Sequence, residues 1–214
     1  MSILYNKKDP GMLKNYREKQ RFLSFRFVIL IALLFVSGGC ASNNIKHYLR
    51  PNADVNAVRR IAVLPIESLT QDQYAGEKVR RVVITELLSR GVDVIEPGEV
   101  TNFLRTLNKP LWSLSREDIK KLGETLNVDA VMMGSVEAYA ISSGLTVSYP
   151  EVSVNFRLVE TSTGAILWSA VNTSGGASFW TRHFGTENIS LSETARRVVK
   201  EAVDTLPVSY KTNS

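Results

Sequence analysis

The chain has 214 residues, of which 44% are apolar and 22% are charged, as is ordinary for a globular protein. This length favours a single domain, with a targeting segment attached to it. One cysteine and two histidines exclude a disulfide framework and leave little for a zinc or iron–sulfur site, so we expect no metal and no cofactor.

The formal net charge of +5 comes entirely from the N-terminal region. Of the 26 basic and 21 acidic residues, seven and two lie within residues 1–39, which leaves 19 of each in the rest of the chain. A protein that binds nucleic acid needs a basic surface on its folded part. The charge distribution therefore argues against a nucleic-acid partner.

The first recognisable element is an uninterrupted apolar run of ten residues, Phe27–Val36, between a basic stretch and small residues. Ten residues cover about half of the hydrocarbon core of a bilayer, so the run is too short for a membrane-spanning helix. Its layout is typical of a secretory signal peptide, which we predict over residues 1–39. Because the basic stretch is long, Met12 is an alternative start to Met1.

The only cysteine, Cys40, stands directly after Gly39 at the end of this region. The order of apolar run, small residues and cysteine resembles a bacterial lipoprotein signal, although Ser37 stands where that signal prefers leucine. The resemblance implies cleavage between Gly39 and Cys40 and acylation of Cys40, including palmitate. Since Ala41 and Ser42 follow, it also implies the outer membrane of a Gram-negative cell, with the protein facing the periplasm. The alternative is an incidental thiol behind an uncleaved apolar anchor.

Residues 40–59 are polar and without an apolar period, and they contain Pro51. We predict a lipidated flexible tether here, with a coil span of roughly 25 Å and a stretched limit of about 70 Å. The folded part should therefore stay close to the membrane that holds the lipid.

Residues 60–207 predict one mixed α/β domain, and residues 208–214 form a tail. The hydrophobic periods predict strands at 60–66, 92–95 and 130–136, and helices at 76–89, 99–107 and 116–126. The second of these helices shows one apolar face, and the third follows a near capping box that begins at Ser115.

The C-terminal part of the domain has the clearest local pattern. An apolar residue at every second position predicts a half-buried strand. These positions are Val152, Val154, Phe156 and Leu158. A turn at 161–164 leads to a returning strand whose inner face should carry Ile166, Trp168 and Ala170. A capping box at Ser190–Glu193 opens a closing helix, so the expected fold is a mixed sheet with a C-terminal β-meander and a closing helix.

The motifs of common enzymes are missing from the sequence. It contains no GxSxG elbow, no HExxH, no CxxC and no phosphate-binding loop. We therefore predict that the protein is not an enzyme; an envelope hydrolase that uses His183 is the weakest alternative.

Three segments, at residues 61–66, 128–135 and 152–168, together resemble the CsgG-like periplasmic lipoprotein superfamily. This superfamily includes the curli secretion channel and the synthase activator LpoB, and the N-terminal domain of TolB is related in fold. The resemblance covers about residues 60–206. It implies an α/β domain like the anticodon-binding domain and a role in recognition, without chemistry.

The resemblance raises the alternative of a secretion channel, in which two hairpins per subunit cross a membrane. A membrane strand needs about 9–11 residues. The first candidate insertion, residues 137–150, has 14 residues, and the second, residues 172–189, is interrupted by glycines and charged residues. We therefore expect no pore.

The function that fits best is a non-catalytic, lipid-anchored accessory or adaptor in outer-membrane or envelope assembly or secretion. Its partners would be the membrane, through the lipid, and an envelope protein of unknown identity; a homo-oligomer is compatible with this. The candidate contact consists of Phe179, Trp180 and Phe184, aromatic residues in a glycine-flanked segment, unless these rings fill the domain's own core. The alternative of an LpoB-like activator of a peptidoglycan synthase requires a longer reach than the tether gives.

Overall fold

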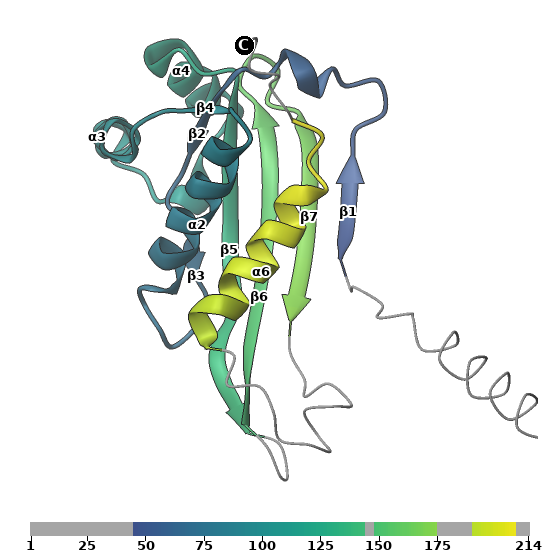
Figure 1. Cartoon of the computed structure of the whole chain (residues 1–214). Coiled ribbons are helices and arrows are strands. Elements are labelled where there is room, and N and C mark those ends of the chain that lie inside the picture. Colours follow the sequence, from purple (N-terminus) through teal and green to yellow (C-terminus); the bar gives the residue numbers. More distant parts are fainter. Residues whose placement is uncertain (1–44, 144–147, 175–189, 209–214) are drawn as a thin grey trace, which may run out of the picture. The chain divides into compact units, whose positions relative to one another are not determined.

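The structure, a computed structural model, describes residues 45–143, 148–174 and 190–208. Helices alternate with short strands in the first part of the domain, and long strands follow (Figure 1). The strands are β1 (Lys46–Leu49), β2 (Arg60–Val63), β3 (Glu67–Ser68), β4 (Asp93–Val94), β5 (Ala130–Ser143), β6 (Ser148–Glu160) and β7 (Ile166–Ser174). The helices are α2 (Ala75–Ser89), α3 (Pro97–Leu107), α4 (Arg116–Leu126) and α6 (Leu191–Asp204), with the 3₁₀ turns η1 (Val55–Ala57) and η2 (Leu111–Ser113).

The seven strands form one mixed sheet in the order β1-β7-β6-β5-β2-β4, and β3 also pairs with β5. β2 runs parallel to β4 and β5, whereas β5, β6, β7 and β1 are antiparallel to their neighbours. The sheet, the C-terminal strands and the closing helix α6 confirm the predicted mixed α/β fold.

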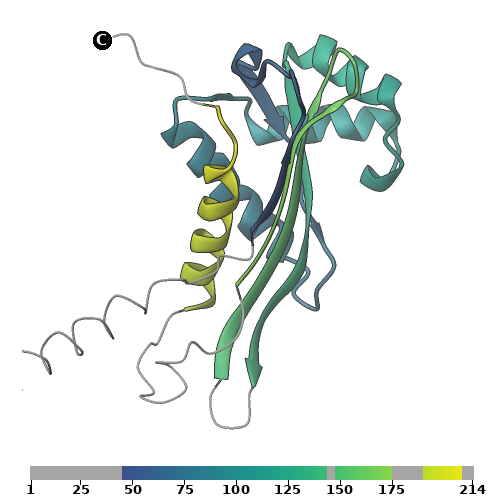
Figure 2. The same ribbon diagram turned by 90° about the vertical axis from the view of Figure 1, so that its right-hand side faces the viewer.

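Two pairs of helices pack against the sheet, one pair on each face (Figure 2). α2 and α6 cover one face, where Phe156 and Trp168 are completely buried in the larger core. The Nε1 of Trp168 donates a hydrogen bond to the Oγ1 of Thr205, 3.0 Å away, and so satisfies the polar edge of the indole. α3 and α4 build a smaller core on the opposite face, mainly over β2 and β5.

Local sequence signals set the helix starts. Ser115 accepts a hydrogen bond from the Asp118 backbone at 3.2 Å, and the Asp118 carboxylate accepts one from the Ser115 backbone at 2.9 Å, so the predicted capping box is present. At the start of α6 the Ser190 hydroxyl accepts from the Glu193 backbone at 3.1 Å.

The alternating strand is also confirmed, but its partner β5 is longer than predicted. β5 continues from Val136 to Ser143 after a bulge, and the pairing with β6 extends to Ser143 opposite Ser148. The candidate insertion at residues 137–150 therefore consists mainly of strand. The result is a long hairpin that projects beyond the helices (Figure 2).

Two expectations were wrong. The segment predicted as a flexible tether at 40–59 contains β1, which pairs with β7, and the buried side chains of Val55 and Val58. The expected inner-face position of Ile166 is also incorrect, because a register shift between Leu158 and Val159 leaves Ile166 42% exposed. The edge strand depends on pairing with a strand that is distant in the sequence, and the bulge depends on the register between the two strands of a hairpin. A local hydrophobic period shows neither of them.

Candidate functional site

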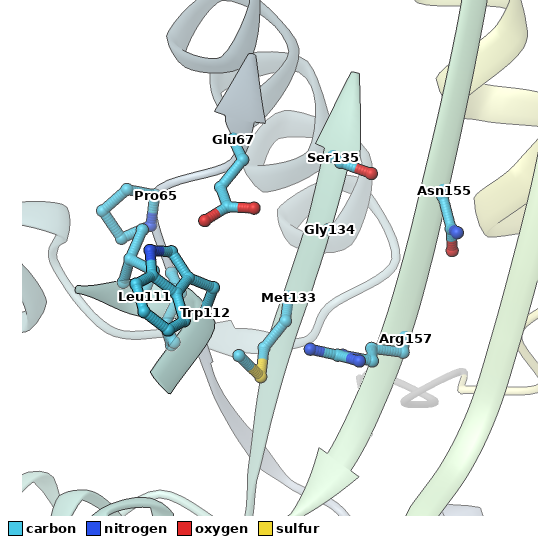
Figure 3. A pocket seen from close by; sticks show the side chains of 10 residues that line it. Pro65, Glu67, Leu111, Trp112, Met133, Gly134, Ser135, Asn155 and Arg157 are labelled. Carbon is cyan, nitrogen blue, oxygen red and sulfur yellow. The ribbon is translucent and has the colours of Figure 1, made fainter. Parts of the chain in front are cut away.

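A hollow of about 190 Å³, which we call the groove, lies at the edge of the smaller core. It lies where the cover of α3 and α4 ends and the outward face of β5 and β6 begins. Its lining comes from four parts of the chain (Figure 3): Leu64, Pro65 and Glu67 after β2, Leu111 and Trp112 of η2, Met133, Gly134 and Ser135 of β5, and Asn155 and Arg157 of β6.

One wall of the groove is the short turn η2, which presents Trp112 with 78% of its surface exposed. The chain just before this turn is fixed in two ways. Asn108 ends α3 in the left-handed conformation, and the Lys109 ammonium lies 2.9 and 3.0 Å from the two carboxylate oxygens of Asp118. Trp112 is therefore an exposed indole on a well-anchored turn.

Asp118 joins this turn to the start of α4. Three hydrogen bonds lower the pKa of Asp118 to about 2; the largest effect comes from the Ser115 backbone, followed by those from Lys109 and the Ser115 hydroxyl. The carboxylate is therefore charged near neutral pH, and its ion pair with Lys109, which stands just before η2, depends on that charge.

The floor of the groove is the outward face of the sheet, arranged in two rows across the strands. Glu67 of β3 lies beside Ser135 of β5, which pairs with Asn155 of β6. In the next row Met133 pairs with Arg157. Figure 3 shows the Glu67 carboxylate directed into the hollow and the Arg157 guanidinium directed towards Met133.

Gly134 separates these two rows, and its lack of a side chain is required by the packing. A Cβ at this position would lie 2.4 Å from the carbonyl oxygen of Asn155 and 2.7 Å from the ring of Phe156. The glycine therefore lets Phe156 fill the core behind the groove.

The strand end behind Pro65 is fixed by a buried arginine. Arg80 of α2 is 4% exposed, and its Nε and Nη2 donate to the Val63 carbonyl at 3.1 and 2.7 Å. Burial lowers the pKa of Arg80, and the Glu77 charge opposes this shift. Because Val63 ends β2, this contact holds the wall of the groove from inside.

The groove combines groups suited to recognition. It offers a carboxylate, a guanidinium, an amide and a hydroxyl around a small apolar surface and an exposed indole. Tryptophan and arginine are the residue types that contribute most to protein interfaces. A segment with both polar and apolar groups could bind here through hydrogen bonds and packing.

Within the described ranges, no group of three or more histidine, cysteine or acidic residues is placed to hold a metal ion. A search of the same residues for helices with the length and apolar character needed to span a membrane finds none.

The site residues predicted from the sequence all lie outside the described residues. These are Gly39 and Cys40, at the predicted cleavage and lipidation site, and Phe179, Trp180 and Phe184, at the predicted partner contact. They remain predictions.

The groove itself was missed in the sequence analysis. Arg157 and Asn155 could be assigned to an outward face from the alternation in their strand, but their neighbours come from distant segments. The available signal was Trp112, a large aromatic residue between an apolar-faced helix and a capping box.

Comparisons with known proteins give a family and a fold. The family model described as FlgO protein matches residues 43–174. No curated protein matches the chain. Among solved structures, the chain is similar to the PelC dodecamer from Paraburkholderia phytofirmans, with 22% identity over 78% of this chain and 99% of that chain, and a TM-score of 0.56.

Two further solved structures are more distant. Lipoprotein GNA1162 from Neisseria meningitidis has 20% identity over 68% of this chain and 99% of that chain, with a TM-score of 0.49. The LpoB C-terminal domain from Escherichia coli has 14% identity over 58% of this chain and 100% of that chain, with a TM-score of 0.40. The likeness to PelC concerns the fold, whereas the family model matches more than half of the 214 residues, and so the chain belongs to the FlgO family.

Proposed function

We propose that this protein is a lipid-anchored, non-catalytic accessory of the bacterial envelope, which faces the periplasm from the outer membrane and recognises an envelope protein through the groove. The resemblance to CsgG-like lipoproteins, with the accessory role in assembly or secretion that it implies, is part of this proposal.

The lipid anchor is supported by the order of sequence elements before the domain. The apolar run Phe27–Val36 is followed by small residues and the only cysteine, Cys40. Two or more acyl chains on this residue would make the membrane attachment stable, at about 0.8 kcal/mol per buried CH₂ group.

The observation that carries the recognition role is the exposed indole of Trp112 above an outward sheet face that α3 and α4 leave open. An exposed tryptophan contributes little to the stability of the folded domain, because its apolar surface stays in water. In a protein complex the same side chain would bury a large apolar area and position its N–H for a hydrogen bond. Glu67 and Arg157, of opposite charge, would select the polar groups of the partner.

The short connection to the lipid argues against an LpoB-like activator of a synthase in the inner membrane. β1 begins at Lys46, six residues after Cys40, and six residues span about 20 Å at full extension. The domain would thus stay beside the outer membrane. A homo-oligomer is compatible with this position, and the similar PelC structure is a dodecamer.

The experiment is photocrosslinking in intact cells with a photoreactive amino acid at position 112. We expect a discrete crosslinked product with an envelope protein, identified by mass spectrometry. The control carries the same amino acid at Leu88 of α2, which is 52% exposed and is not one of the residues that line the groove.

A second variant, Arg157→Ser, removes the guanidinium from the groove without changing a buried side chain. Weaker crosslinking from position 112 in this background, at unchanged thermal stability, would support recognition by the groove. The same products from positions 112 and 88, or none from either, would contradict it.

A further inference from the structure

The point where the chain enters the domain is fixed by the register of the sheet. Lys46, the first residue of β1, pairs with Val171 of β7. Val171 pairs with Asn155 of β6, which pairs with Ser135 of β5. These four residues form one row across the sheet, and the row marks the level at which the chain arrives from Cys40.

The β5–β6 hairpin continues well beyond this level. β6 begins at Ser148, seven residues before Asn155, and Ser148 pairs with Ser143 at the end of β5. At about 3.3 Å per residue, the described end of the hairpin lies roughly 23 Å past the entry row. In Figure 1 and Figure 2 the described end of the hairpin projects from the same end of the sheet as the first residue of β1.

The segment between Cys40 and β1 is too short to hold the membrane farther from the entry row than the end of the hairpin. From Cys40 to Lys46 there are six residues, which reach about 20 Å when fully extended. If Cys40 carries the lipid, as the proposed function requires, the membrane surface lies within about 20 Å of the entry row. A domain that stands with its strands towards the membrane must then bring the end of the hairpin to that surface.

The residues at this end have the chemistry of a membrane interface. No charged residue occurs between Glu137 and Glu151 in the sequence. Ile141 is 55% exposed, and Tyr149 on the partner strand is half-buried. Tyrosine favours the boundary between lipid headgroups and acyl chains, and an exposed isoleucine is stabilised when its apolar surface is buried at that boundary. The helices α2 and α6 beside the sheet carry ion pairs on their surfaces instead.

We propose that the end of the β5–β6 hairpin, formed by Ala140–Ser143 and Ser148–Pro150, is a second membrane contact that rests in the headgroup layer of the bilayer holding the Cys40 lipid. The contact stays in the headgroup layer because the open edges of a two-stranded hairpin need water or polar headgroups for their backbone groups. It would orient the domain, so that the groove is held at a set height above the membrane.

The test uses the native lipidated protein with Ile141→Cys. Acylation of Cys40 leaves this new cysteine as the only free thiol, and an exposed position accepts the change without loss of folding. The thiol is labelled with an environment-sensitive fluorophore, and the protein is reconstituted in phosphatidylethanolamine–phosphatidylglycerol vesicles that contain headgroup-nitroxide lipid. The matched control is Ser162→Cys, exposed in the turn at the opposite end of β6.

We expect severalfold stronger nitroxide quenching at position 141 than at position 162, with a blue-shifted emission at 141 only. Equal, weak quenching at both positions in protein that floats with the vesicles would overturn the second contact and leave the lipid anchor intact. Protein that does not float, and whose N-terminal peptide carries no lipid, would refute the proposed anchor and the inference that rests on it.

Discussion

Replacing Arg80 with methionine tests the internal support of the groove. Val63 ends β2, and its carbonyl points to the same side as that of Ile61, which accepts a hydrogen bond from the Ile95 backbone at 3.1 Å. The ladder with β4 includes only Arg60 and Ile61, so the guanidinium of Arg80 takes the place of a strand partner for Val63.

The magnitude follows from the group that would be left without a partner. A buried carbonyl that loses its hydrogen bond costs about 1–3 kcal/mol, and methionine retains most of the packing of the arginine stem. We expect Arg80→Met to lower the free energy of unfolding by about 2 kcal/mol, which corresponds to a Tm about 4–8 °C lower in a domain of this size.

The same helix provides the control. Arg81 is next in sequence and also lies near Glu77, at 3.4 Å, but its side chain is 77% exposed. An exposed ion pair contributes about 0.2–1 kcal/mol, so Arg81→Met should change the Tm by less than about 3 °C.

The assay is thermal unfolding followed by circular dichroism, on a chain that begins at residue 41 and so contains every described residue. Equal Tm losses in the two variants, or no loss in Arg80→Met, would refute the structural role of Arg80.

Two further predictions concern a close approach and a titration. Gly76→Ala should destabilise the protein by about 1–3 kcal/mol in denaturant unfolding despite the better helix propensity of alanine, because the new Cβ would lie 1.9 Å from the Ile66 carbonyl oxygen. Gly98→Ala, whose Cβ meets the movable Glu96 carboxylate at 2.6 Å, should change stability by less than about 1 kcal/mol; equal losses would contradict this reasoning. For Asp118, the pKa of about 2 in the folded state lies below the ordinary 3.8, so its stabilising contribution is complete above pH 3.8 and disappears as the pH falls towards 2. The Tm difference between wild type and Asp118→Asn should therefore be constant near neutral pH and shrink below pH 3.8, and a difference independent of pH would argue against the contribution.

Local patterns in the sequence predicted most of the fold. The alternation from Val152 to Leu158 and the capping box at Ser115 involve residues that are close in sequence, and each is present where expected. The inner face of β7 was assigned incorrectly at Ile166 because the register shift depends on the pairing with β6.

Features that depend on distant contacts could not be predicted. All four residues of β1 are exposed and show no hydrophobic period, and the strand exists through its pairing with β7, from Lys46 opposite Val171. The groove likewise needs Trp112 and Arg157 together, and only the folded sheet brings their segments to one surface. β5 continues beyond Val136 after a bulge, and no residue pattern in the sequence predicts that bulge.

The position of the protein at the membrane is the claim on which the proposed function and the hairpin contact both depend. Its most direct test is mass spectrometry of the N-terminal peptide of the protein purified from its own membranes. We predict a peptide that begins at Cys40 and carries a diacylglyceryl group and an amide-linked acyl chain. An unmodified Cys40 thiol within an uncleaved chain would contradict the account.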